Sequence, residues 1–204
     1  GRDILTDQNG KYNLQVRKTL EVIYTTYKGN KKSANFKALE KYLKQVWFAN
    51  GIHHHYSKDK FTPEFSQKFF NQRLKAIPKS KLPLMKGQTK SSFIKIMNKV
   101  IFDKNFMAKG VNLAAGQDLI TTSANNLYEG VTQKEVEAYY NSIKDANDPT
   151  PVSYGLNAKV VKENGKVVEK VYKVGGLYSD AIKKIVANLK EAAKYAENDQ
   201  QRAY

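Results

Sequence analysis

Cysteine is absent from the 204-residue sequence, which excludes disulfides, thiolate metal sites and cysteine nucleophiles. Histidine is scarce, and its three copies lie side by side at His53, His54 and His55. A reaction that needs histidines from two separate segments is therefore not available to this chain.

Long apolar runs are also missing. No stretch of about 18 apolar residues occurs, so we expect no membrane-spanning segment. No basic and then apolar leader typical of a signal peptide is visible, so we expect a cytoplasmic protein unless a signal lies in a preceding segment. Hydrophobic residues make up 41% of the chain and aromatic residues 11%, which is ample for a folded core.

Acidic residues are few in the first half of the chain. Residues 1–110 hold 23 basic and 7 acidic residues, whereas residues 111–204 hold 12 of each. Such a block is typical of a nucleic-acid footprint or of a solvated lysine face. The basic residues are nearly all lysine and no nucleic-acid-binding motif accompanies them, so we favour the solvated face and expect neither nucleic acid nor a membrane as a partner. A lysine-rich nucleic-acid-binding module remains the alternative.

Helical periodicity dominates as far as residue 148. Apolar residues repeat at helical spacing over about 16–27, 36–47, 65–74, 93–101 and 136–143. Ser33 is a predicted N-cap, Asn50-Gly51 a predicted helix end, Thr62-Pro63 a predicted helix start, and Thr132 with Glu135 a predicted capping box. Residues 111–130 show no regular pattern.

The pattern changes from helix to strand after Asn147–Pro151. Two strand-like runs, 156–163 and 166–174, flank Asn164-Gly165, which is a strong hairpin signal. A last helix is predicted from Ser179 towards Tyr204 without a stop signal, which suggests a chain cut from a longer protein. We therefore expect an α+β fold with a mainly helical part over 1–148 and a hairpin-plus-helix part over 149–204.

Motifs that carry chemistry are mostly absent. The sequence has no His-Glu-x-x-His helix, no P-loop, no G-x-S-x-G elbow and no G-x-G-x-x-G. The unusual stretch is 50–56, with its three consecutive histidines. In an extended segment only His53 and His55 would share a side, which is too few ligands for a zinc site. The trio is open to three interpretations: part of a metal site, the lining of a cleft, or a structural loop.

This stretch resembles the bacterial branch of the dipeptidyl peptidase III family of zinc metallopeptidases. The resemblance is carried by the run Trp47–Ser57 followed by Asp59–Pro63. Further similar runs occur in the same order at residues 1–5, 7–13, 130–140, 151–157 and 174–178. The resemblance therefore covers essentially the whole chain.

The resemblance implies a two-lobed enzyme that removes dipeptides from peptide N-termini. Its zinc is held on a His-Glu-x-x-Gly-His helix with a further glutamate, and this chain has neither motif. The chain would be a section of the non-zinc lobe, inactive alone, with its hairpin belonging to a small β-barrel. Its partners would be peptide substrates and the remaining zinc-bearing lobe, with the zinc ligands outside this chain.

The resemblance also implies a role for the loop that follows residue 49. It would face the cleft, with Tyr56 near the pocket for the first residue of the substrate. An aromatic wall and imidazole hydrogen-bonding groups suit that task. The expected substrate-binding residues are Asn50, Gly51, His53, His54, His55 and Tyr56, with no catalytic residue and no metal ligand in this chain.

Overall fold

The computed structural model describes residues 1–150 and 154–203. Residues 151–153, at the start of the similar run 151–157, lie outside the described residues, as does Tyr204. The chain is α+β and divides into two compact units, Arg2–Asn126 and Leu127–Tyr204. The predicted division between residues 148 and 149 falls within the second unit, in the loop between helix α6 and strand β2.

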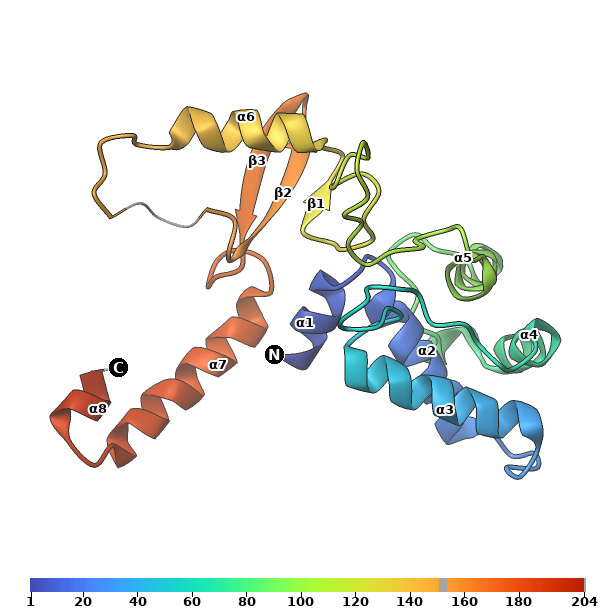
Figure 1. Ribbon diagram of the computed structural model, residues 1–204. Helices are drawn as coiled ribbons and strands as arrows, with labels where there is room; N and C mark the ends of the chain where they lie inside the picture. The colour runs from blue at the N-terminus through green and yellow to red at the C-terminus, as the bar shows by residue number, and fades with distance from the viewer. Residues whose placement is uncertain (151–153, 204) are drawn as a thin grey trace. The chain divides into compact units, whose positions relative to one another are not determined.

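The first unit is helical. Its helices are α1 (Arg2–Gln8), α2 (Asn13–Thr26), α3 (Ala34–Ala49), α4 (Gln67–Ala76) and α5 (Lys90–Phe102), with a 3₁₀ turn at Lys79–Lys81. Helices α2 and α3 pack against each other, as the two amphipathic stripes predict (Figure 1). The core that they share with α4 and α5 is built from fully buried side chains such as Leu20, Leu43, Phe70 and Phe93.

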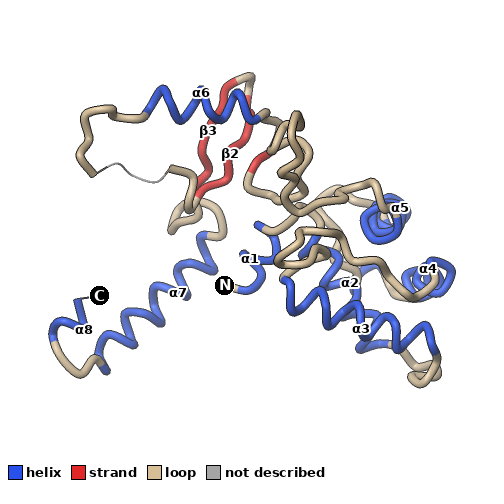
Figure 2. The backbone as a smooth tube through the Cα atoms, viewed as in Figure 1, coloured by secondary structure: helices blue, strands red, loops and turns tan. Residues whose placement is uncertain are grey.

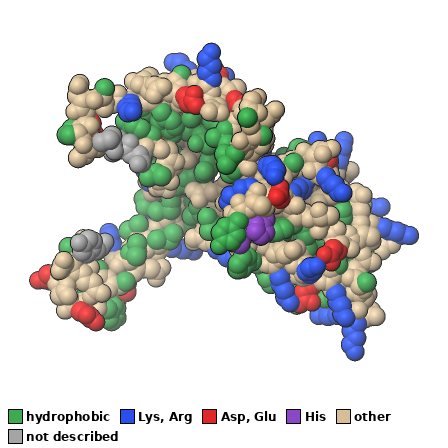
Figure 3. All heavy atoms as spheres, viewed as in Figure 1, with side chains coloured by type: hydrophobic (Ala, Val, Ile, Leu, Met, Phe, Trp, Pro, Cys, Tyr) green, Lys and Arg blue, Asp and Glu red, His purple; other side chains and the backbone are tan. Residues whose placement is uncertain are grey.

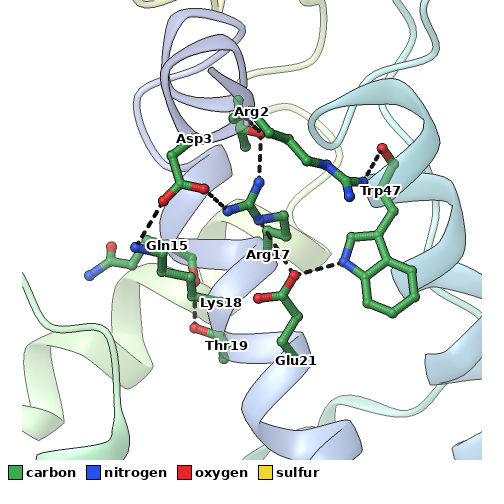
Figure 4. Close-up of polar contacts among 9 residues, drawn as sticks. Arg2, Asp3, Gln15, Arg17, Lys18, Thr19, Glu21 and Trp47 are labelled. Atoms are coloured by element: carbon green, nitrogen blue, oxygen red, sulfur yellow. Dashed lines mark hydrogen bonds and ion pairs between the residues drawn. The ribbon is translucent and has the colours of Figure 1, made fainter. Parts of the chain in front are cut away.

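A polar network ties the N-terminal helix to this core. The Arg17 side chain is 7% exposed, forms an ion pair with Asp3 and donates to the Thr6 hydroxyl at 3.1 Å (Figure 4). Glu21 lies 3.5 Å from the Arg17 guanidinium and accepts a 2.7 Å hydrogen bond from the Trp47 indole. Because α1 buries only Thr6, the contacts of Arg17 with Asp3 and Thr6 help to hold α1 against α2.

The second unit contains the hairpin. Its elements are β1 (Tyr128–Glu129), α6 (Gln133–Ile143), β2 (Ala158–Glu163), β3 (Lys166–Val171), α7 (Ser179–Ala192), a 3₁₀ turn at Ala193–Tyr195 and α8 (Asp199–Ala203). Strands β2 and β3 pair antiparallel around Asn164 and Gly165, both of which have positive φ, as the predicted turn requires (Figure 2). Helix α6 packs on β3, where the Tyr140 hydroxyl donates to Glu169 at 2.7 Å.

One expectation for this unit needs correction and another is not tested. Among the described residues the sheet has the order β1-β2-β3, with β1 parallel to β2, and it is not closed into a barrel, so the expected barrel would need strands from outside this chain. The predicted uninterrupted last helix is wrong because Ala196 is extended, and Asn198 then accepts a hydrogen bond from the Gln201 amide as a new short helix starts. Among the described residues, no helix combines the length and apolar character needed to cross a membrane.

Candidate functional site

The candidate site begins where helix α3 ends. Asn50 takes the left-handed conformation (φ 53°, ψ 38°) that the predicted helix end requires, and its carbonyl accepts a 3.3 Å hydrogen bond from the Asn9 side chain. Gly51 follows so close to Asn13 that an added Cβ would lie 2.2 Å from the Asn13 side-chain nitrogen. Only glycine fits this position, which fixes the direction in which the chain leaves the helix.

The chain then forms a tight hairpin-like loop. His53 bridges to Lys60 in antiparallel fashion, and the Phe61 amide donates to the Ile52 carbonyl at 2.8 Å. The tip turns at residues 55–57 and returns through Lys58, which has a φ of 61°. The loop is therefore held at its base by backbone pairing, and its tip carries His55 and Tyr56.

His53 is a buried residue of this loop. His53 is 7% exposed, and its Nε2 lies 2.7 Å from the Met107 carbonyl oxygen. Because a carbonyl only accepts, Nε2 carries the proton and Nδ1 has a free lone pair. Burial lowers the pKa of His53 from its usual range, which keeps the ring neutral.

His54 and His55 are less buried than His53. Their rings stack with centroids 5.0 Å apart, and the His54 Nδ1 accepts from the backbone amides of Tyr56 and Ser57 at 3.3 Å. The chain is not extended here because it turns at 55–57, yet His53 and His55 both line one small cavity. The three imidazoles are thus divided between one buried and two surface positions.

A row of aromatic rings continues from these two histidines. The Phe48 ring lies 5.2 Å from His55, and the Tyr56 ring lies 4.0 Å from His55 on the loop tip. Phe48 is 75% exposed and Tyr56 is 81% exposed, although both are large aromatic side chains. Figure 3 shows histidine side chains at the surface beside an apolar patch. Such a cluster is unusual for a solvated surface and is typical of a binding site.

A groove of about 610 Å³ lies against part of this row. Helix α3 contributes one side and the histidine loop contributes the other. The groove is lined by Lys37, Glu40, Lys41, Lys44, Gln45, Phe48, His54, His55 and Phe61. Two of its lysines are already paired, Lys41 with Glu64 at 2.5 Å and Lys44 with Glu40 at 2.9 Å. The groove therefore offers an aromatic surface with a charged rim.

The six predicted substrate-binding residues take different positions in this arrangement. His54 and His55 line the groove, whereas Asn50 and Tyr56 are not part of its lining. Gly51 and all three histidines line a second, smaller cavity of about 90 Å³. The histidines and Gly51 thus line two adjoining hollows, which share His54 and His55. Asn50 instead forms the C-cap of helix α3.

Sequence reasoning missed the contribution of α3. Glu40, Lys44 and Phe48 repeat at intervals of four residues, off the apolar stripe that includes Leu39 and Leu43. A phenylalanine outside the buried stripe of its helix is a signal that could have drawn attention to this face. Phe61 was equally detectable as an aromatic residue just after the histidine run.

Part of the lysine block serves the local structure. Lys60 donates to the carbonyls of Asp103 and Phe106 at 2.7 and 2.8 Å, and burial lowers the pKa of its ammonium to about 8. Lys90 donates to the carbonyls of Lys75 and Ile77, and Lys109 pairs with Asp59. Several members of the block therefore hold helix ends and loops together.

Within residues 1–150 and 154–203, no group of three or more His, Asp or Glu side chains is placed to hold a metal ion. A scan against models of known protein families finds no match. A search of curated proteins also finds no match. The resemblance noted from the residue runs therefore remains a prediction.

Proposed function

We propose that this chain is a section of a zinc-dependent, dipeptidyl peptidase III-like exopeptidase and forms part of the wall of its substrate cleft. In this proposal the zinc and its ligands belong to protein outside this chain, and the hairpin unit joins the remaining strands of a barrel. The chain alone binds peptides and does not hydrolyse them.

The observation that carries the proposal is the exposed aromatic row beside the groove. Peptide side chains need an apolar surface, and the main chain needs hydrogen-bonding partners at its edge. Phe48, His55 and Phe61 supply the first requirement, and the imidazole rings with the lysine and glutamine side chains of α3 supply the second. Phe48, His55 and Phe61 lie within the runs Trp47–Ser57 and Asp59–Pro63, which carry the resemblance.

The first test measures hydrolysis. The purified chain is incubated with a dipeptidyl arylamide and zinc, with and without a chelator. We expect no chelator-sensitive release of arylamine, because metal-assisted hydrolysis needs an ion that polarises the carbonyl and activates water. Measurable zinc-dependent release would show that this chain carries its own catalytic centre and would overturn the proposal.

The second test separates peptide binding from nucleic-acid binding, which the lysine block offers as a rival. Binding of a fluorescent single-stranded oligonucleotide is measured over a salt series. A nucleic-acid-binding module loses affinity steeply as salt rises, whereas a solvated lysine face binds weakly throughout. Tight, strongly salt-dependent binding that competes with peptide would favour the rival function.

A further inference from the structure

A second hollow lies beside the groove, and its chemistry is different. It has a volume of about 90 Å³ and is lined mainly by polar residues, among them Asn13, His53 and Lys58. His54 and His55 line both hollows, so the small cavity adjoins the groove. It is larger than one water molecule and far smaller than the cavities that hold drug-sized ligands.

Two buried polar atoms of this cavity lack hydrogen-bond partners. Asn13 is 1% exposed; its Oδ1 accepts from the Ile52 amide at 3.4 Å, while its Nδ2 has no partner. His53 is 7% exposed and its Nδ1 has no partner either. Buried polar groups are rarely left unpaired, and each exception calls for an explanation. The side chains that line the cavity therefore include one unpartnered donor and one unpartnered acceptor.

We propose that this cavity binds a neutral carboxamide group, with its carbonyl oxygen on Asn13 Nδ2 and its N–H on His53 Nδ1. The proposal stands on these two atoms and does not depend on the proposed peptidase function. An amide both accepts and donates, so it satisfies both atoms at once. It can come from an Asn or Gln side chain or from a peptide main chain.

The same two atoms discriminate against charged groups. An alkylammonium ion only donates, so it meets the Asn13 N–H donors unfavourably, and the Lys58 ammonium on the cavity wall repels it further. A carboxylate only accepts, so it faces the lone pair of His53 Nδ1. Lys58 attracts a carboxylate, but its Nζ already donates to the His55 carbonyl at 2.7 Å. The site thus favours amide over either ion at neutral pH.

The test is a nuclear magnetic resonance titration of the full chain at pH 7.5, because its three histidines all lie in this loop. Acetamide, N-methylacetamide, sodium acetate and methylammonium chloride are added separately at constant ionic strength. We expect a saturable shift of the His53 Nδ1 resonance with at least one amide and weaker binding of both ions. A response to acetamide indicates a side-chain amide as the natural ligand, and a response to N-methylacetamide indicates a main-chain amide.

A matched pair of variants sharpens the test. Asn13→Asp keeps the shape and replaces the donor by an acceptor, so acetamide affinity should fall about tenfold or more while methylammonium binding improves. Asn30→Asp makes the same change at an exposed turn and should leave both affinities unchanged. The proposal would be overturned if acetate bound more tightly than either amide. It would also be overturned if no amide gave a saturable shift in the wild-type chain. The wild-type titrations decide the matter even if Asn13→Asp fails to fold.

Discussion

Phe48 offers a clean separation between folding and binding. Its side chain is 75% exposed, so folding buries only about a quarter of it. Full burial of a phenylalanine stabilises by about 1.5–3 kcal/mol, so the buried quarter contributes about 0.4–0.8 kcal/mol. The edge-on contact with His55 adds little at an exposed position. Phe48→Ala should therefore lower the free energy of unfolding by less than about 1 kcal/mol.

The cost to peptide binding should be larger. If a peptide in the groove covers the exposed three quarters of the ring, truncation removes about 1.1–2.3 kcal/mol, or about a 5- to 50-fold loss of affinity. The assay follows the histidine resonances while a tetrapeptide with an apolar N-terminal pair is added, and urea unfolding gives the stability. Leu113→Ala is the control, because Leu113 is 83% exposed in the same unit and does not line the groove. Equal affinities for Phe48→Ala and wild type would refute the assignment of this groove.

Two further predictions concern the framework of the first unit. Because the folded-state pKa of His53 lies below its usual value, the contribution of His53 to stability should be constant above about pH 6.5 and should fall as the pH drops from there towards the folded-state pKa. Urea unfolding at several pH values measures this, and His53→Gln should flatten the slope; a wild-type chain that gains stability over this range would contradict it. Arg17→Met should cost about 1–3 kcal/mol, because it leaves the buried Thr6 hydroxyl without its donor and removes the ion pair with Asp3. Lys18→Met, at a half-exposed residue that also pairs with Asp3, should cost less than about 1 kcal/mol in the same unfolding assay.

Local signals were the part of the fold that sequence reasoning captured. Ser33 accepts from the Phe36 amide and Thr132 forms a capping box with Glu135, as predicted. Asn164-Gly165 makes the expected hairpin turn. Each of these depends on residues within a few positions of one another, so the sequence alone specifies them.

The sequence did not show which of two nearby cap residues starts helix α4. The Thr62-Pro63 start was wrong, because helix α4 is capped by Ser66, whose side chain accepts from the Phe69 amide at 3.2 Å. Both sites have a cap residue, and packing of Phe69 and Phe70 into the core selects the later one. The short strand at Tyr128–Glu129 was missed because two residues in a ladder carry no periodic signal.

The candidate site was located from sequence, but its geometry was not. The run of histidines pointed to the loop that carries the candidate site. Which imidazole is buried depends on the Met107 carbonyl, 54 residues further along the chain, and on a turn at the loop tip. The contribution of Phe48 depends on how α3 rotates its outer face towards that loop. Such long-range relations cannot be derived from spacing.

The most direct test of the proposed peptide-binding wall is the response of the three histidine resonances to a short peptide. We expect saturable shifts at His54 and His55, which line the groove, in the wild-type chain under conditions where no peptide bond is cleaved. The claim that this loop is a peptide-binding wall would be contradicted in either of two cases. The His54 and His55 resonances could stay unchanged at peptide concentrations that saturate binding elsewhere on the chain, or they could shift only with nucleic acid.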